Sequence, residues 1–269
     1  MGFQALQRRL DATTTSSPGA ADPMLRLAWV APVGCLAVLC ALAAVLAPFP
    51  SVFRVVMWSE QGLVENLTVA LAVGGAILAL RLACSPDQAW AMRLWHAMFF
   101  LMLAFLAGEE TSWGQQWFGW ATPEDFAAIN QQGETNLHNL GHDWIEDVPK
   151  TLVILAMTVC GLIVPLFIGF SGRRLAVPAW LRALWPSAAL WPVAAVYTAA
   201  RVVERVIAAT YEVSSWGLYF RTLREGLEVF VVLYLTLYLW DRWVRLRQAQ
   251  AVSAADDATA AMAFPRRRL

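Results

Sequence analysis

Long apolar runs alternate with short polar stretches along most of this chain. Six runs are long enough to supply the roughly 20 residues that a helix needs to cross the hydrocarbon core of a membrane. They cover residues 27–48, 62–82, 92–110, 151–170, 187–209 and 217–240. The pattern predicts an all-α fold: an integral membrane helical bundle of about six transmembrane helices, without an internal repeat or a second domain.

The two ends of the chain lack this pattern. Residues 1–24 are polar and rich in Ser, Thr and Pro, and residues 246–269 have no regular apolar spacing. We therefore expect two disordered tails around a six-helix domain at 25–245. The first apolar run shows no clear small-residue cleavage site, so it is interpreted as a retained helix and not as a signal peptide.

The composition supports a membrane protein. The chain is 59% hydrophobic and 15% charged, whereas a soluble domain carries roughly 25% charged residues. The formal net charge of zero identifies no partner, and no nucleic-acid partner is expected. The four cysteines form no CxxC pair, so neither a metal–thiolate site nor a disulfide framework is expected.

The placement of arginine sets the expected orientation. Arginines gather in the N-terminal tail, in the links after the second and fourth runs, and at the start of the C-terminal tail. They are Arg8, Arg9, Arg26, Arg81, Arg93, Arg173, Arg174, Arg182, Arg242, Arg245 and Arg247. With six spans these segments share one side, which the positive-inside rule makes cytoplasmic. Residues 109–149 hold eight acids and neither Lys nor Arg, so the predicted outer loop, 111–150, belongs to the opposite face.

Ionisable and amide side chains lie at the outer ends of four predicted spans. They are Glu65, Asn66, Glu109, Glu110, Arg201, Glu204, Arg205, Arg221, Arg224, Glu225 and Glu228. In the frame of six spans these residues reach one level of the bundle. We therefore expect a polar chamber in its outer third, with the long outer loop as the lid.

The spacing of the charges indicates where they point. Arg221, Arg224, Glu225 and Glu228 stand at i, i+3, i+4 and i+7, which is one face of a helix. A charge that faces lipid near the bilayer centre costs about 2.5–3.5 kcal/mol on insertion scales, so this face is expected to point inward. Two interpretations stay open: an Arg–Glu network that locks the fifth and sixth helices together, and a ligand or reaction site.

His96, near the cytoplasmic end of the third run, is interpreted as a polar anchor.

The outer loop begins with the sequence GEETSWGQQWFGW, residues 108–120. Its three tryptophans are typical of an aromatic belt at the membrane interface. The following ATPEDFAAINQQG predicts a short helix on the membrane surface, with Thr122 as the N-cap and Pro123 as its first residue.

The stretch ETNLHNLGH, residues 134–142, carries much of the candidate chemistry. Glu134, His138 and His142 are four residues apart and would align on a helix. Nearby neutral donors and acceptors are Gln115, Asn136 and Asn139. One hypothesis is a divalent metal, Zn, Mn or Fe, held by Glu110, His138 and His142. The alternative is a hydrogen-bonded plug without a metal.

The segment 109–139 also resembles a family of bacterial multi-span membrane proteins that is itself uncharacterised. Its pattern, EExSWGQ followed by NxQxExNxHN, falls on Glu109, Glu110, Ser112, Trp113, Gly114, Gln115, Asn130, Gln132, Glu134, Asn136, His138 and Asn139. The resemblance implies a bacterial protein, and the placement of arginine then puts the loop on the periplasmic, outer face of the cytoplasmic (inner) membrane. It implies no activity, and His142 lies outside its pattern.

Together these residues suggest a function for the chamber. Guanidinium groups match phosphate and carboxylate geometry, and four arginines, at 201, 205, 221 and 224, approach the expected chamber. Glu109, Glu110, Glu134 and His138 are candidate general acids and bases. The leading hypothesis is an enzyme, a hydrolase or head-group transferase acting on a lipid or lipid-linked anionic substrate. The alternatives are a transporter that uses the buried charges and a structural or assembly subunit of a membrane complex.

Overall fold

The computed structural model is all-helical, as the sequence predicts. It describes residues 21–59, 62–130, 132–137, 140, 143–171, 178, 181, 184–210 and 213–263, and within these ranges there is no β-strand.

Four of the predicted spans are confirmed as helices long and apolar enough to cross a membrane. They lie in α2 (Ala21–Leu46), in α4 (Leu63–Ala83), in α5 (Trp90–Glu110), and in a continuous segment, Val148–Ser171. That segment joins α8 (Asp143–Ala156), the π-helix η2 (Met157–Ile163) and α9 (Val164–Ser171). The chain is therefore a membrane protein.

The fifth and sixth predicted runs are also helices, but charge interrupts both. α11 (Trp191–Thr210) carries Arg201, Glu204 and Arg205 within its 20 residues. In α12 (Val213–Ala263) only the 12 residues 229–240 separate Glu228 from Asp241. An apolar stretch of that length is more typical of a helix buried in a core than of an isolated membrane span.

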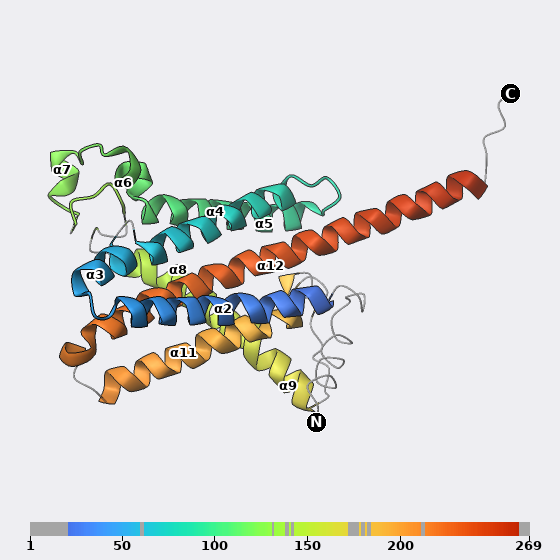
Figure 1. Ribbon diagram of the computed structural model, residues 1–269. Helices are drawn as coiled ribbons and strands as arrows, with labels where there is room; N and C mark the ends of the chain where they lie inside the picture. Colours follow the sequence, from blue (N-terminus) through green and yellow to red (C-terminus); the bar gives the residue numbers. More distant parts are fainter. Residues whose placement is uncertain are drawn as a thin grey trace.

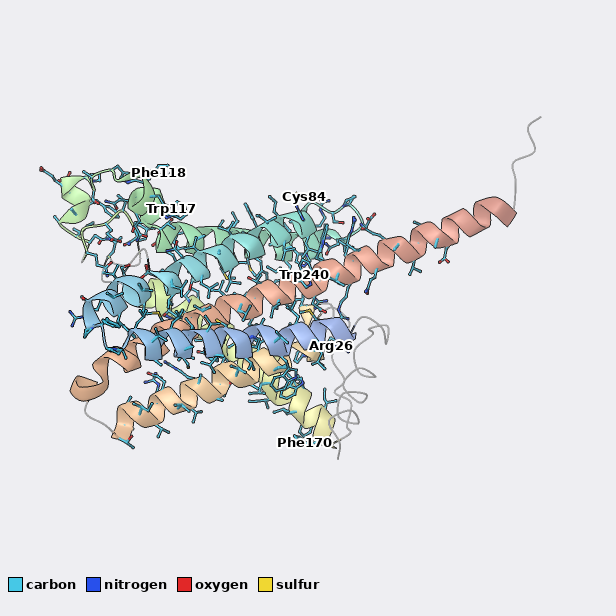
Figure 2. All side chains as sticks on the ribbon, in the orientation of Figure 1. Arg26, Cys84, Trp117, Phe118, Phe170 and Trp240 are labelled. Atoms are coloured by element: carbon cyan, nitrogen blue, oxygen red, sulfur yellow. The ribbon has the colours of Figure 1, made fainter. Side chains whose placement is uncertain are left out.

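The long helices lie side by side, and their connections gather at two ends (Figure 1). One end, which we call the loop end, carries α3 (Pro50–Trp58), α6 (Gln115–Phe118) and α7 (Glu124–Ala127). The other, the arginine end, carries the turn between α4 and α5 and the start of α2, where Arg26 and Cys84 are labelled in Figure 2. The chain thus runs back and forth between the two ends.

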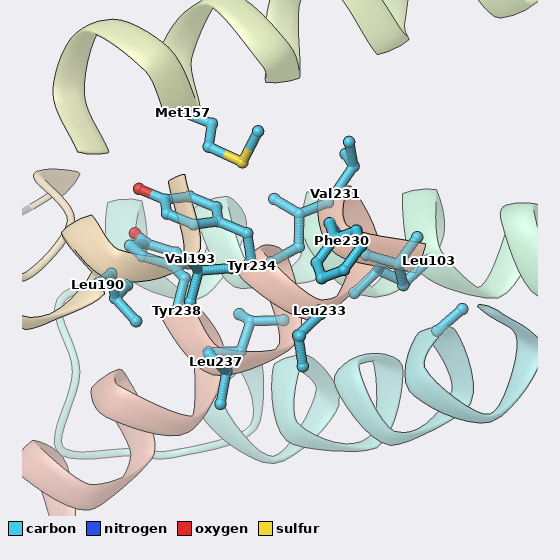
Figure 3. Packing of buried hydrophobic residues seen from close by; sticks show 14 of the residues in the cluster. Leu103, Met157, Leu190, Val193, Phe230, Val231, Leu233, Tyr234, Leu237 and Tyr238 are labelled. Carbon is cyan, nitrogen blue, oxygen red and sulfur yellow. The ribbon is translucent and has the colours of Figure 1, made fainter. Parts of the chain in front are cut away.

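α12 lies at the centre of the packing. Its buried side chains include Phe230, Tyr234 and Tyr238, and Figure 3 shows them beside side chains from α5, η2 and α11. The small residues of α4 allow a close approach: a Cβ atom on Gly75 would lie 2.8 Å from Leu103 and 2.9 Å from Thr236. Small residues at such contacts are typical of membrane helices, which associate through close packing.

Two predicted boundaries differ from the structure. The C-terminal tail predicted as disordered, 246–269, is helical as far as Ala263, because this segment is rich in alanine, the strongest helix former. Gln250 also ties it to the α4–α5 turn by donating a hydrogen bond to Asp87, at 2.6 Å. α8 begins at Asp143, inside the segment predicted as loop. Most of the predicted N-terminal tail, residues 1–20, lies outside the described residues.

Candidate functional site

The outer loop begins with a left-handed turn at the end of α5. Ser112, Trp113 and Gly114 have φ angles of 48°, 58° and 97°, a conformation that costs a non-glycine residue roughly 1–2 kcal/mol. The turn sends the Trp113 ring back along α5, where its centroid lies 5.8 Å from that of Phe105. The ring passes so close to Gly108 that a Cβ atom there would lie 2.9 Å from it. The glycine before the two glutamates therefore makes room for the tryptophan.

Glu109 is the buried acid of the pair and is held from both sides. Its side chain is 4% exposed. Its Oε1 accepts a hydrogen bond from the Trp113 indole N–H at 2.7 Å, and its Oε2 accepts one from the backbone N–H of Leu137, also at 2.7 Å. One carboxylate thus joins the first part of the motif to the last. Glu110, the final residue of α5, is half-buried.

A second carboxylate joins the same two parts of the loop. Oε2 of Glu134 accepts hydrogen bonds from the Ser112 hydroxyl at 2.6 Å and from the Asn136 amide at 2.7 Å. The same Asn136 amide lies 3.1 Å from the Ser112 oxygen, to which it also donates. Asn136 is 1% exposed and Ser112 is fully buried. Glu134 is therefore positioned by side chains that are themselves immobilised.

Two amide side chains complete the network. Gln115 accepts hydrogen bonds from the backbone N–H and the hydroxyl of Thr135, at 2.8 and 3.0 Å, and donates to the Thr122 hydroxyl at 2.8 Å. Asn130 donates to the Asn136 carbonyl at 2.8 Å and accepts from the backbone N–H of Glu134 at 3.1 Å. We call the set the loop knot; it consists of Glu109, Ser112, Gln115, Asn130, Glu134 and Asn136.

The loop knot changes two local predictions. Thr122 does not cap a helix, because α7 begins at Glu124 after Pro123 without a side-chain cap, and the Thr122 hydroxyl accepts from Gln115 instead. Residues 132–137 form turns and bends, so Glu134 does not start a helix on which His138 would align. His138, Asn139 and His142 lie outside the described residues.

The predicted metal site stays a prediction. Within the described ranges, no three His, Cys, Asp or Glu side chains are placed to hold an ion together. Two of its three predicted ligands, His138 and His142, fall outside those ranges. Asn66, a predicted binding residue near the start of α4, donates a hydrogen bond to the Gly62 carbonyl at 2.9 Å. Glu65, beside it, is half-buried.

A second polar cluster joins α8, α11 and α12. Glu204 of α11 is 3% exposed, and its Oε2 lies 2.9 Å from a guanidinium nitrogen of Arg201 and 3.6 Å from Nε of Arg205. Lys150 of α8 forms an ion pair with Glu228 of α12. Tyr197, one turn before Arg201, is buried in α11. We call these two sets of paired charges together the charge cluster.

The predicted Arg–Glu network between the fifth and sixth helices stays a prediction. The described ion pairs of the charge cluster run within α11 and from α8 to α12. Arg221, Arg224 and Glu225 are helical in α12, but their side chains lie outside the described part of the structure. Lys150 was missed, because it follows Pro149 at the start of an apolar run and belongs to no charged stripe.

Exposed aromatic side chains cover the outside of the loop. Trp117 and Phe118 project from α6, as Figure 2 shows, and Phe118 is 77% exposed. The ring of Phe118 stacks on that of Trp120, with centroids 5.9 Å apart. Rings at the end of a membrane helix are typical of the boundary between lipid and water.

No protein-family model matches this chain, and no curated protein or solved structure was found to be similar to it. Function is therefore inferred from the geometry of the loop knot and the charge cluster.

Proposed function

We propose that this chain is a membrane enzyme that acts at the loop end on a lipid or lipid-linked substrate with an anionic head group. The reaction class is hydrolysis or head-group transfer. The observation that supports this most directly is the position of Glu109, a buried carboxylate in the last turn of the membrane helix α5. Two donors, the Trp113 indole and the Leu137 backbone N–H, fix both of its oxygens.

The Leu137 contact bears on catalysis because His138 is the next residue. The anchored residue, Leu137, is the last described residue before His138, so Glu109 is the carboxylate with which we propose that His138 acts. A carboxylate beside a histidine orients the imidazole and stabilises its protonated form, the arrangement used for general acid–base catalysis. In this proposal His138 exchanges the proton with the reacting water or head group, and Glu109 orients it.

The charge cluster supports an anionic head group. Lys150, Arg201 and Arg205 supply three positive charges, against the two negative charges of Glu204 and Glu228. Within these five residues the sum is one positive charge. Guanidinium groups bind phosphate oxygens with two hydrogen bonds at once, so a phosphate-containing head group fits best.

The proposal includes six membrane crossings, with both chain ends in the cytoplasm of a bacterium and the loop end outside. The burial of Glu204 supports α11 as a span, because its charge faces the bundle and not lipid. A reporter that is active only outside the cytoplasm should be active when fused near Gln132 and silent when fused after Arg247. The reverse pattern would contradict the orientation.

The reaction is tested on purified protein in lipid vesicles. The vesicles contain phosphatidylethanolamine, phosphatidylglycerol and cardiolipin, with a polyprenyl diphosphate as the lipid-linked probe, and head-group loss or exchange is followed by mass spectrometry. Glu109→Gln and His138→Ala should lower turnover by at least about 100-fold. Glu124→Gln, which changes an exposed acid of the same loop, is the matched control and should leave turnover unchanged. Folded protein that alters no head group in this panel would contradict the proposal.

One observation favours a second candidate, a docking surface for another membrane protein. Glu109 and Glu134 each accept two hydrogen bonds from neutral donors of the loop itself, which is also how a purely structural loop is stabilised. In that case Trp117→Ala and Phe118→Ala would abolish capture of a partner in crosslinking experiments. His138→Ala would then have no effect on capture or on lipid composition.

A further inference from the structure

Two exposed arginines mark the level at which two membrane helices stop at the arginine end. Arg81 lies in the last turn of α4, which ends at Ala83, and Arg93 lies in the first turn of α5. Each helix has 21 residues, about the number that crosses the hydrocarbon core, so both arginines lie at the level of lipid head groups. The Arg93 Nε–H donates to the Ala83 carbonyl at 2.9 Å, which holds its guanidinium against the end of α4. His96, one turn further along α5, is 1% exposed and lies inside the bundle.

A third exposed arginine comes from α12. The guanidinium carbons of Arg247 and Arg81 lie 5.4 and 5.9 Å from the centre of one indole, that of Trp243. Both distances are within the range of a cation–π contact. Gln250 of the same helix donates to Asp87 in the α4–α5 turn at 2.6 Å, so α12 contacts the end of α4 and the following turn on both sides of Arg247. We call the three arginines the basic surface; it consists of Arg81, Arg93 and Arg247.

The basic surface has a surplus of positive charge. Among the described residues, no carboxylate forms an ion pair with any of its three guanidinium groups. Asp87, in the adjoining turn, accepts from Gln250, and Asp241 of α12 pairs with Arg245. Two guanidinium groups that contact the same indole repel each other. An anion at this surface therefore stabilises the arrangement.

Apolar side chains lie exposed beside these arginines. Ile77 is one turn deeper in α4 than Arg81, on the same helix face, and is 48% exposed. Leu94, next to Arg93 in α5, is 59% exposed. The acyl chains of a lipid whose head group binds the arginines would bury part of this apolar surface, which a free anion leaves uncovered. The surroundings therefore favour a lipid over a soluble anion.

We propose that the basic surface binds the head group of an anionic phospholipid. A guanidinium group donates two hydrogen bonds at once to phosphate oxygens. The indole of Trp243 positions two of the three guanidinium groups and the Ala83 carbonyl positions the third, so little side-chain freedom is lost on binding. The basic surface and the loop knot lie at opposite ends of the bundle (Figure 1), so this lipid is distinct from the substrate proposed above.

The test measures lipid binding to the full chain, purified in detergent, by native mass spectrometry. Phosphatidylglycerol is titrated against phosphatidylcholine, which has a phosphate but no net charge. Phosphatidylglycerol should bind saturably and at least about tenfold more tightly. Inorganic phosphate at the same concentration as the lipid should not displace it, because phosphate makes no apolar contact.

The variants separate the basic surface from general attraction by positive charge. Arg81→Gln and Arg247→Gln should each weaken the binding of phosphatidylglycerol at least about fivefold, because hydrogen bonds to a charged group are lost. Arg26→Gln removes the same charge from an exposed position at the same end, outside the basic surface, and should change the affinity less than about twofold. Thermal unfolding without added lipid checks that all three variants are folded.

Three results would overturn the proposal. Equal affinity for the two lipids would show that the charge of the head group is not recognised. Displacement by inorganic phosphate would show that the occupant is a soluble anion. A loss of affinity in Arg81→Gln or Arg247→Gln no larger than that in Arg26→Gln would show that the arginines form no defined site. Since lipid turnover is not measured, none of these outcomes depends on activity at the loop end.

Discussion

At the loop end Asn136 is as deeply buried as His96 is at the arginine end, each with 1% of its surface exposed. Asn136 donates to Ser112 and Glu134 and accepts from Asn130. His96 has no such partner among the described residues. A buried polar group needs a partner to offset its lost hydration. The comparison indicates that the side chains of the loop knot satisfy one another, whereas His96 has no such side-chain network in the described structure.

The sequences of the two regions explain this difference. Every residue from 130 to 136 except Gly133 has a polar side chain, so donors and acceptors are close enough to satisfy one another. In α5 the neighbours of His96 are Trp, Ala, Met and Phe, which offer few side-chain partners. A lone polar residue on an apolar helix depends on tertiary contacts or on backbone carbonyls of its own helix for its hydrogen bonds.

The largest effect is expected when the loop knot receives an extra charge. Asn136→Asp places a second carboxylate beside the Glu134 oxygen that now accepts from Asn136 at 2.7 Å. Two buried like charges in contact should lower the free energy of unfolding by about 3–5 kcal/mol. Thermal unfolding in detergent measures this, with Asn66→Asp as an exposed control at a helix start. Equal stability of both variants would mean that the loop knot is open to water.

A smaller effect is expected for Glu109→Gln. The amide of Gln can accept only one of the two hydrogen bonds, because its NH₂ group faces either the Trp113 or the Leu137 N–H. Loss of a hydrogen bond to a charged group should cost about 1.5–3 kcal/mol. Amide hydrogen exchange at Leu137 should accelerate accordingly, while that of the α4–α5 turn at the arginine end stays unchanged. Acceleration at both ends would show that the variant loosens the whole bundle.

The sequence predicts the limits of two membrane helices well because a continuous apolar run is a local feature of the chain. Residues 62–82 and 92–110 are continuous apolar runs, and the structure begins and ends α4 and α5 within two residues of these limits. The helical tail up to Ala263 was missed, since its polar and alanine residues lack an apolar stripe. Helix propensity, not periodicity, was the signal that could have found it.

The candidate site is predicted only in part, because its contacts join distant segments. Gln115 and Asn136 are predicted binding residues and Ser112 belongs to the family pattern; the structure brings all three into the loop knot, and a binding role for them stays a prediction. Their pairing depends on a left-handed turn at Ser112 and Trp113, which neither residue type indicates. Likewise, Lys150 and Glu228 are 78 positions apart, and no periodic pattern relates them.

The next prediction reverses the sign of the first. His96→Leu replaces a buried imidazole without a side-chain partner by an apolar group of similar size, so the protein should become more stable by about 1–2 kcal/mol. Asn136→Leu, the matched change at the loop end, should destabilise it. Thermal unfolding of both variants gives the two signs directly. A loss of stability in His96→Leu would show that the imidazole has a partner that stabilises it.

The smallest loss of stability is expected for Trp113→Phe, which separates packing from hydrogen bonding in the loop knot. Phenylalanine keeps a ring against Phe105 and Gly108 but loses the indole N–H that Glu109 accepts at 2.7 Å. Leu137 still donates to the other oxygen, and no N–H group is turned against another donor as in Glu109→Gln, so the cost should lie at the low end of the range expected for that variant, about 1.5 kcal/mol. Trp113→Ala removes the ring as well and should cost more.

Trp117→Phe, at an exposed position of the same loop, is the control and should leave the unfolding temperature unchanged. If Trp113→Phe and Trp113→Ala are equally unstable, the hydrogen bond to Glu109 stabilises the turn. If Trp113→Phe matches the unaltered protein, ring packing does so, and the carboxylate remains available for another donor such as His138.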